Sequence, residues 1–407
     1  MKKAIAAFLC IMLATGMISG CAERKQEPDT TQESTSTEDT EKTQNSPEDA
    51  SGEQKKDQES DSQEEKNSDE DDTETSDNEE RDMTEDLAMS VLKDQAGSVD
   101  YTSFEELELE AGSRIAVVLK SARDDFWTTV REGIEDAVKE KKKKMGYTGE
   151  DQITVSFDAP ADDTDVEKQI DLIDTVLSEN PTILCIAAID RQSCEAQLEM
   201  AAENDIPVVM MDSGVDNGPV SALCATDNYG AGVEAAKRLA EAIEDKGQIA
   251  VMAHAESAQT SQDRERGFSD EITKNHPDIE IVNVSHENAD FTMEEMANAV
   301  FTLYPEVNGY FCTNKEASDA VLNAADAAGK ELAVVGFDSD EQQRSAVENG
   351  TEIGFIAQNP YGMGYAAVTA GVRASQGLPV DSFVNTSYQW IDSSNLKDEK
   401  YSSYFYG

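Results

Sequence analysis

The chain has 407 residues, of which 85 are acidic and 33 are basic, and its formal net charge is −52. A surface this negative repels the phosphates of nucleic acids and of anionic lipids, which excludes nucleic-acid binding and polybasic membrane binding. The chain contains three histidines, too few to favour a histidine-built metal centre, and we expect neither a metal nor a cofactor. The length suits two domains, or one large domain plus a tail.

The N-terminal segment indicates export. Two lysines precede an apolar run over residues 4–18, which has the length of a signal-peptide core and is shorter than the ~20 residues that span a bilayer. Residues 18–21 read Ile-Ser-Gly-Cys and resemble the bacterial lipobox, in which the cysteine receives a diacylglycerol and becomes the mature N-terminus. We expect a signal peptide over residues 1–20 and a lipid on Cys21. An ordinary secretory signal with an incidental cysteine is the alternative.

The segment that follows is strongly acidic. Residues 22–86 contain 26 acidic and 7 basic residues, almost no large apolar side chains and no periodic pattern. Such a segment buries too little apolar surface to offset the entropy lost on ordering. We expect residues 21–86 to form the lipidated cysteine and a disordered acidic tether, with an acidic tail for a basic partner as the alternative. Residues 87–111 are transitional, with a short helix near residues 84–94.

From Arg114 onward, apolar strand-like runs alternate with amphipathic helical segments. Residues 114–119 are apolar almost throughout, as in a parallel strand that is buried on both faces. Two successive rounds of alternation predict an α/β fold with two doubly wound parallel-sheet domains. The expected strands are 114–119, 153–157, 182–187, 207–211, 220–224, 248–253, 280–284, 309–312 and 332–337, and the expected helices are 126–144, 165–178, 194–204, 230–244, 262–275, 293–303 and 317–328.

Several residues in these runs are expected to be structural. Cys185, Cys224 and Cys312 lie inside apolar strand-like runs, where a thiol behaves as a small buried hydrophobe. We therefore expect no disulfide framework. Phe268 and Phe337 are expected in the core for the same reason.

The residues that follow each predicted strand are the candidates for function, because ligands of such sheets bind beyond the carboxyl ends of the strands. These residues combine short carboxylates, amides, guanidinium groups and flat aromatic rings. Charged groups form strong directional hydrogen bonds to hydroxyls, and ring faces cover the C–H faces of a sugar, so the mixture suits a neutral polyol. The segments are 120–127, 212–213, 264–268, 288–291, 313–315, 336–338 and 355–359.

With these segments in this order, the chain from about Arg114 to its C-terminus resembles the type I periplasmic sugar-binding proteins, the ribose and galactose/glucose receptors of ABC importers. The resemblance implies two α/β domains joined by a three-stranded hinge. The implied boundaries are 112–226 plus 358–384 for the N-terminal domain, 227–357 plus 385–407 for the C-terminal domain, and 226–227, 356–358 and 384–387 for the hinge.

The same resemblance implies three kinds of ligand-binding residue. These are hydroxyl ligands, one arginine on the ring or anomeric oxygens, and aromatic walls contributed by both domains. The hydroxyl ligands are Asp124, Asp212, Asn314, Asp338 and Gln358, the arginine is Arg266, and the walls are Phe126 with Trp127 on one side and Phe291 on the other.

Some positions depart from the family pattern or have a second interpretation. Lys120 stands where the family has a small or neutral residue, and it either pairs with Asp124 or faces the pocket and binds an anionic group. Ser213 stands where the ribose receptor has a second arginine. Arg264 is interpreted as a surface or hinge ion-pair residue, and packing between helices is the alternative for Trp127.

The function that the resemblance implies is a lipid-anchored receptor on the extracytoplasmic face of the bacterial cell membrane. It would capture a monosaccharide-like ligand by hinge closure and deliver it to an ABC permease, as a monomer that meets the membrane through its lipid alone. The alternative is a sensor that presents its closed form to a membrane kinase or chemoreceptor. An enzyme is not expected, because the sequence contains no Gly-x-Ser-x-Gly elbow, His-Glu-x-x-His motif or phosphate-binding loop.

Overall fold

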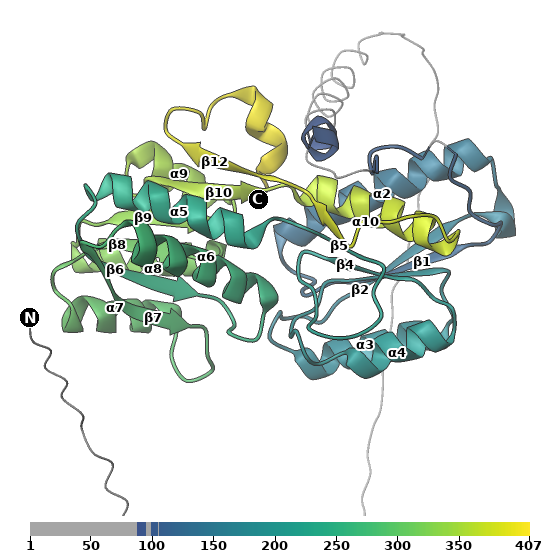
Figure 1. Cartoon of the computed structure of the whole chain (residues 1–407), viewed down its shortest axis with the longest axis horizontal. Helices are drawn as coiled ribbons and strands as arrows, with labels where there is room; N and C mark the ends of the chain where they lie inside the picture. Colours follow the sequence, from purple (N-terminus) through teal and green to yellow (C-terminus); the bar gives the residue numbers. More distant parts are fainter. Residues whose placement is uncertain (1–87, 95–98, 105) are drawn as a thin grey trace, which may run out of the picture. The chain divides into compact units, whose positions relative to one another are not determined.

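The computed structural model describes residues 88–94, 99–104 and 106–407, all within one compact unit (Figure 1). The predicted signal peptide, the lipidation site Cys21 and the acidic tether lie outside the described residues. Within the described ranges, no helix is both long enough and apolar enough to cross a membrane.

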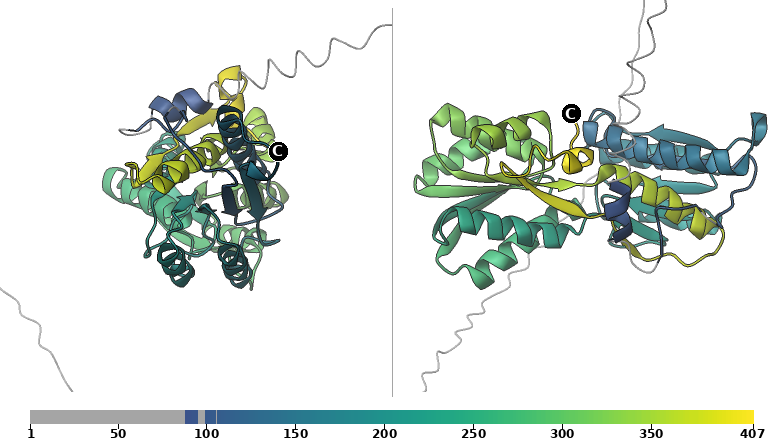
Figure 2. Two further views of the ribbon diagram at one scale, coloured as in Figure 1. Left: turned by 90° about the vertical axis from the view of Figure 1, so that its right-hand side faces the viewer. Right: turned by 90° about the horizontal axis from the view of Figure 1, so that it is seen from above.

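Two six-stranded sheets, each flanked by helices, make up this unit (Figures 1 and 2). All neighbouring strands are parallel except for the pair formed by residues 354–358 and 388–392, which is antiparallel. The predicted α/β fold with two doubly wound sheets is therefore confirmed, and each sheet with its helices is called a lobe below. From edge to edge, the first sheet contains β11 (Phe383–Asn385), β5 (Ala222–Ala225), β4 (Val208–Met211), β3 (Ile183–Ile186), β1 (Arg114–Val118) and β2 (Thr154–Asp158). The second contains β12 (Tyr388–Asp392), β10 (Gly354–Gln358), β9 (Ala333–Phe337), β8 (Val307–Cys312), β6 (Gly247–Ala253) and β7 (Ile279–His286).

Helices cover both faces of each sheet, so alternate strand residues are buried on opposite sides. The helices of the first lobe are α2 (Asp125–Met145), α3 (Val166–Ser178), α4 (Glu195–Glu203) and α10 (Pro360–Ser375). Those of the second lobe are α5 (Asn228–Ala242), α6 (Gln259–Asn275), α7 (Met293–Leu303), α8 (Lys315–Ala328) and α9 (Glu341–Asn349). Two short 3-10 helices, η1 (Gly149–Asp151) and η2 (Glu399–Tyr404), lie in connecting segments.

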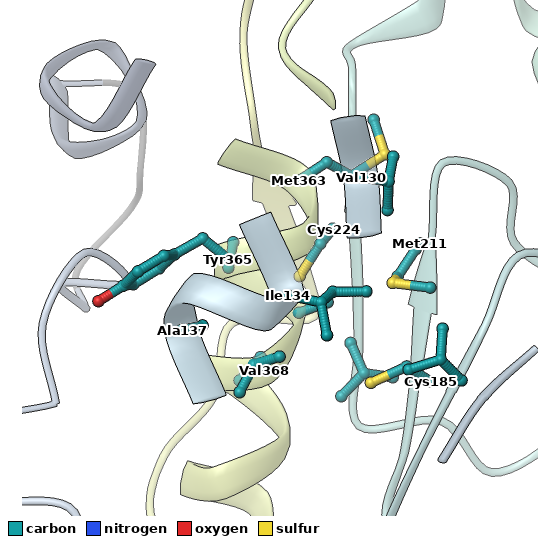
Figure 3. Packing of buried hydrophobic residues seen from close by; sticks show 14 of the residues in the cluster. Val130, Ile134, Ala137, Cys185, Met211, Cys224, Met363, Tyr365 and Val368 are labelled. Carbon is teal, nitrogen blue, oxygen red and sulfur yellow. The ribbon is translucent and has the colours of Figure 1, made fainter. Parts of the chain in front are cut away.

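In the first lobe, α2 and α10 pack together over one face of the sheet. Figure 3 shows Ile134 of α2 and Met363 of α10 close to side chains of the strands, among them Cys185 and Met211. The other face packs against α3 and α4 through a separate apolar cluster. All four described cysteines are buried and free, which confirms the expected thiols at Cys185, Cys224 and Cys312.

The pairing of α2 with α10 depends on glycine. A Cβ atom added at Gly364 would lie 2.1 Å from the carbonyl oxygen of Val130, and one added at Gly133 would lie 2.1 Å from the carbonyl oxygen of Tyr361. Real Cβ atoms do not approach that closely, so the two backbones meet only because both residues lack a side chain. The sequence analysis did not predict α10, since its glycines are typical of helix breakers.

The chain crosses between the lobes three times. It leaves the first sheet after β5, returns to the first lobe after β10, and passes from β11 to β12. The residues Phe355–Gln358, which the sequence analysis placed after a strand, are the strand β10 itself.

The described residues between 88 and 111 pack mainly against the first lobe, although the sequence analysis treated them as transitional. Residues 88–94 are helical. The amide of Asn359, at the start of α10, donates to the carbonyl oxygen of Ala88 at 3.0 Å. Five apolar side chains of this segment are buried in the hydrophobic cluster that also contains residues of α2 and α10: Leu92, Tyr101, Phe104, Leu107 and Leu109.

Candidate functional site

The carboxyl ends of both sheets carry charged side chains that face one another. In the first lobe, Lys120 follows β1 and Asp212 follows β4. Lys120 Nζ lies 2.7 Å from Asp212 Oδ2, and the two side chains are 11% and 7% exposed. The predicted ion pair of Lys120 with Asp124 is wrong, because the short loop after β4 brings Asp212 to the lysine instead.

Asp124 connects the two lobes. Its carboxylate caps α2, where it accepts from the Phe126 backbone N–H at 2.9 Å, and it also lies 2.5 Å from Nζ of Lys315. Lys315 is the first residue of α8 in the second lobe. Burial lowers the pKa of Lys315, but the Asp124 carboxylate outweighs that effect and the pKa is raised overall. The ammonium is therefore charged at physiological pH, and the ion pair spans the two lobes.

Asp338 links several polar groups of the second lobe by hydrogen bonds. It follows β9 and is 7% exposed. Its Oδ1 accepts from Gln358 Nε2 at 2.7 Å, and its Oδ2 accepts from the backbone N–H of Lys315 at 3.1 Å. Burial raises the pKa of Asp338, and the Arg264 guanidinium and the Gln358 amide oppose that increase.

Gln358 extends this network into the first lobe. Its Oε1 accepts from Thr226 Oγ1 at 2.8 Å, and both residues are buried. Thr226 follows β5 and Gln358 ends β10, so the hydrogen bond joins two of the three crossings. A change in the angle between the lobes would alter this contact.

Asp212 and Asp338 share an unusual backbone conformation. Their φ angles are +57° and +79°, in the left-handed region that few residues other than glycine, Asn and Asp adopt. Because β4 and β9 hold corresponding places in the two sheets, the same device presents a carboxylate from each lobe. Residues held in such conformations cluster at functional sites.

Arg264 is the buried arginine at this site. It is 3% exposed, and it donates to Asn228 Oδ1 at 2.8 Å and to the carbonyl oxygen of Thr313 at 2.7 Å. Its guanidinium lies 3.6 Å from the centroid of the Phe337 ring. Burial lowers the pKa of Arg264, and the carboxylates of Asp338 and then Asp212 oppose that decrease. The guanidinium is therefore within electrostatic reach of carboxylates from both lobes.

Arg266 points elsewhere. Its side chain is 63% exposed and pairs with Asp263 at 2.7 Å. The interpretation of Arg264 as a surface residue is wrong, because its side chain is buried. Helical spacing could have predicted this burial. Arg264 precedes Phe268 by four residues and so shares its face of α6, and Phe268 was expected in the core. Phe268 and Phe337 are both fully buried, as predicted.

The aromatic residues of the first lobe form a buried group. Phe126 and Trp127 are 6% and 5% exposed, and their ring centroids are 4.9 Å apart. Trp127, like Phe126, belongs to the hydrophobic cluster of the first lobe. Phe291, the expected opposite wall, is 62% exposed and makes no ring contact with them in the part of the chain that the structure describes.

Two further residues, Asn314 and His254, lie close to these groups. Asn314 caps α8 by accepting from the Ala317 N–H at 3.1 Å, and its amide donates to Glu316 at 2.6 Å. His254 follows β6 and lies 2.8 Å from the hydroxyls of both Thr313 and Thr260. The sequence analysis missed His254 and assigned no role to Lys315, although Lys315 lies in one of the segments that follow predicted strands.

Each of the three positive charges described at this site has a carboxylate nearby. Lys120 is paired with Asp212, Lys315 with Asp124, and Arg264 is under the influence of Asp338. An anionic ligand would have to displace a carboxylate that is already paired, whereas a neutral polyol can hydrogen-bond to both partners. No group of three or more potential metal ligands occurs among the described residues.

Comparison with known proteins places the chain in a family. The sequence pattern of the periplasmic binding protein domain matches residues 115–379, which is more than half of the chain. The chain is similar to the ribose import binding protein of Bacillus subtilis, at 23% identity over 67% of this chain and 84% of that protein. It is also similar to the D-allose-binding periplasmic protein of Escherichia coli, at 24% identity over 67% of this chain and 88% of that protein.

Solved structures show the same fold. An ABC transporter solute binding protein from Agrobacterium vitis, bound with α-D-tagatopyranose, is 26% identical and superposes with a TM-score of 0.66, over 72% of this chain and 99% of that one. A carbohydrate transporter solute binding protein from Agrobacterium radiobacter, in complex with D-arabinose, is 24% identical with a TM-score of 0.65, over 71% and 97%. The two six-stranded sheets and the three crossings are those of the type I periplasmic binding protein fold. The chain belongs to the periplasmic binding protein domain family.

Proposed function

We propose that this protein is an extracytoplasmic solute-binding protein that captures a neutral monosaccharide between its two lobes and delivers it to an ABC importer. The observation that carries the proposal is the convergence of hydrogen-bonding groups from both lobes. Asp124 of the first lobe and Lys315 of the second lie 2.5 Å apart, and Asp338 continues the contact through Gln358 to Thr226. A ligand held by such groups would bridge the lobes.

The names of the relatives support a sugar as the ligand. The curated relatives bind ribose or allose, and the similar solved structures hold D-arabinose or α-D-tagatopyranose. These ligands are all uncharged. The pairing of Lys120 and Lys315 with carboxylates favours the same class here, and it does not favour a sugar acid bound by Lys120.

The proposed ligand residues differ from the sequence prediction in one assignment. We assign the gripping arginine to Arg264, because it is buried beside Asp338, and not to the exposed Arg266. The aromatic surface against the C–H face of the sugar comes from Phe126 and Trp127. The hydroxyl ligands remain Asp124, Asp212, Asn314, Asp338 and Gln358.

Binding would proceed by closure of the lobes about the three crossings. A sugar that contacts both lobes binds the closed form better than the open form, and so it shifts the equilibrium between them. The importer would then recognise the closed form. Nothing in this cycle makes or breaks a covalent bond, in agreement with a transport protein and not an enzyme.

The lipid on Cys21 and the acidic segment 22–86 complete the proposal. Two or three acyl chains anchor a protein durably. A flexible chain of this length has an end-to-end distance on the order of 45 Å, so the lobes would be held near the membrane with freedom to meet the permease.

A thermal-shift screen tests the proposal. Full-length protein in mild detergent is heated with each of about a hundred monosaccharides, sugar acids and polyols, and unfolding is followed by tryptophan fluorescence. Ligand at 1,000 times its Kd adds about 4.1 kcal/mol to the free energy of unfolding, so one neutral sugar is expected to raise Tm by several degrees. Well-folded protein with an unchanged Tm across the screen would contradict a sugar ligand.

A further inference from the structure

The C-terminal residues run through the candidate site. After η2, the chain continues through Phe405, Tyr406 and Gly407. Arg344 of α9 holds this tail, donating to the carbonyl oxygens of Tyr406 and Gly407 at 2.9 Å each. Ser339, directly after Asp338, donates to the carbonyl oxygen of Tyr404 at 2.6 Å. The tail backbone is therefore fixed to the second lobe.

The Tyr406 side chain reaches across to the first lobe. It is 6% exposed, and its ring meets Phe126 edge to face with centroids 5.7 Å apart and an interplanar angle of 77°. Burial raises the pKa of the phenol well above its usual value, and the carboxylates of Asp338, Asp124 and then Glu316 raise it further. Tyr406 also acts electrostatically on Arg264. The ring thus lies among the residues proposed to hold the sugar.

The geometry leaves no space for a sugar between the two rings. Carbon atoms in contact are 3.5–4.0 Å apart, so a sugar ring sandwiched between Phe126 and a second aromatic ring separates the centroids by roughly 7–8 Å. The observed separation is 5.7 Å. The direct contact of Lys315 with Asp124 at 2.5 Å likewise leaves no room for a ligand hydroxyl between them.

The Tyr406 hydroxyl also lacks a full hydrogen-bond partner. Its hydroxyl is buried and makes no hydrogen bond of regular geometry with any described residue, although the Asp338 carboxylate is close enough to interact with it. A buried polar group without a full partner destabilises the state that contains it. A sugar, which offers several hydroxyls to the same carboxylates, would satisfy them better than one phenol can.

We propose that Tyr406 is an internal occupant of the sugar site: its ring takes the place of the sugar against Phe126, and the ligand must expel the C-terminal tail in order to bind. This inference rests on the proposed function and adds that the Tyr406 side chain competes with the sugar for the site. When the site is free only part of the time, the apparent Kd equals the intrinsic Kd divided by the fraction that is free. A tail that fills the site nine times in ten weakens the apparent affinity about tenfold.

Titration calorimetry on full-length protein in mild detergent tests the inference. The probe sugars are D-ribose, D-allose, D-arabinose and D-tagatose. Tyr406→Ala is expected to bind the best of these about tenfold more tightly than the parent protein. Arg344→Ala, which releases the tail without touching the site, is expected to change affinity in the same direction. Tyr406→Phe keeps the ring in place and is expected to bind no more tightly than the parent, and Tyr401→Ala, in η2, serves as the matched control with unchanged affinity.

Hydrogen–deuterium exchange provides an independent measurement. If the tail leaves the site when sugar binds, saturating sugar accelerates exchange of the Tyr406 and Gly407 amide protons. Slower exchange with sugar, or weaker binding by Tyr406→Ala, would make Tyr406 a wall that covers the ligand and would overturn the inference. Unchanged affinity in both Tyr406→Ala and Arg344→Ala would overturn it as well, while sugar binding itself would keep the proposed function intact. Absence of binding to all four probes in the parent and in Tyr406→Ala would instead count against the proposed function, and the inference would fail with it.

Discussion

The left-handed backbone of Asp212 and Asp338 decides which substitutions are informative at the carboxyl ends of the sheets. Asparagine tolerates this conformation nearly as well as aspartate, whereas alanine does not. Replacement of Asp338 by Ala would therefore add backbone strain to the loss of the carboxylate. Asp338→Asn removes the charge while it retains the size and backbone preference of the residue, and it is the variant that isolates the contribution of the charge to binding.

The first prediction concerns the two arginines of α6. Arg264→Ala is expected to weaken sugar binding by about 2–5 kcal/mol, because it leaves buried partners of a charged hydrogen-bond network unpaired. Arg266→Ala loses an exposed ion pair with Asp263, which is worth about 0–1 kcal/mol, and is expected to bind sugar as the parent does. Calorimetric Kd values measure both effects. Normal binding by Arg264→Ala together with impaired binding by Arg266→Ala would reverse our assignment.

The second prediction concerns pH. Burial first, and then the positive charges of Arg264, Lys120 and His286, lower the pKa of His254 well below its usual value. In the unfolded chain, His254 therefore takes up a proton near pH 6.5, whereas in the folded chain it stays neutral. The free energy of unfolding of the protein consequently falls as the pH drops below 6.5. The slope from one such group is at most about 1.4 kcal/mol per pH unit.

His286 contributes a pH dependence of stability opposite to that of His254, and it serves as a control. Its hydrogen bond to Glu265 raises its pKa, so the stability it contributes is present below pH 6.5 and is lost as the pH rises through the folded pKa. Urea unfolding between pH 5.5 and 7.5 measures both slopes. His254→Gln should flatten the loss of stability toward acid, whereas His286→Gln should steepen it. The same pH profile in the parent and in His254→Gln would contradict the buried, neutral state of His254.

At the scale of elements, the helical pairs α2–α10 and α5–α6 position the site, and the N-terminal segment supports one of them. Leu92, Tyr101 and Phe104 are fully buried in the first-lobe core, with Leu107 and Leu109 nearly so. Full burial of one large apolar side chain contributes about 1.5–3 kcal/mol. Five such side chains approach the whole stability of a typical domain, which is about 5–15 kcal/mol.

The third prediction follows from this burial. A chain that begins at Gly112, where the sequence analysis placed the domain boundary, is expected to unfold at a much lower temperature than one that begins at residue 87, or to be insoluble. Differential scanning calorimetry of the two chains compares them directly. Equal Tm values would mean that residues 88–111 contribute little to the core.

Sequence patterns predicted the strands and helices whose apolar residues recur at a clear spacing. They failed for elements that are buried on nearly all sides or that show no such spacing. β1 and α7 are recognisable because their apolar residues follow the spacing of a buried strand and of an amphipathic helix. α10 has no such face, since nearly all its side chains are buried, and its glycines serve close backbone contact with α2. The strand β11 contains only three residues, and β12 is half-buried along most of its length, so neither shows a clear apolar period.

The candidate site was predictable to the extent that it depends on strand ends. Asp124, Asp212 and Asp338 directly follow predicted strands or start a helix, and the structure brings their charges together. Arg264 was distinguishable from Arg266 by helical spacing. Tyr406 gave no signal, because its place in the site depends on the path of the tail and on its anchoring by Arg344, neither of which has a local pattern.

At the scale of the whole molecule, the two lobes are joined by contacts between charged and polar side chains at the site. The Lys315–Asp124 ion pair and the Thr226–Gln358 hydrogen bond both span the lobes. Such polar contacts can be exchanged for ligand hydroxyls at little cost, unlike an apolar core. This is the property that a protein needs if it is to open, bind and close repeatedly.

The fourth prediction concerns attachment to the membrane. If Cys21 carries the lipid, Cys21→Ser should move the protein from the membrane fraction to the soluble exported fraction. Cys10→Ser, which alters a cysteine inside the apolar run, is the matched control and should leave the protein on the membrane. Fractionation of cells followed by immunoblotting measures the distribution, and retention of Cys21→Ser on membranes would indicate another anchor.

The most direct test of the account is a calorimetric titration of the full-length protein with the sugar identified by the thermal-shift screen, carried out in parallel on Asp338→Asn. We predict one sugar bound per chain in the parent protein, and a loss of about 2–5 kcal/mol of binding free energy in the variant, because the carboxylate that joins Gln358, Lys315 and the ligand is gone. Equal affinity of the two proteins, with both of them folded, would contradict a sugar site at the carboxyl ends of the two sheets.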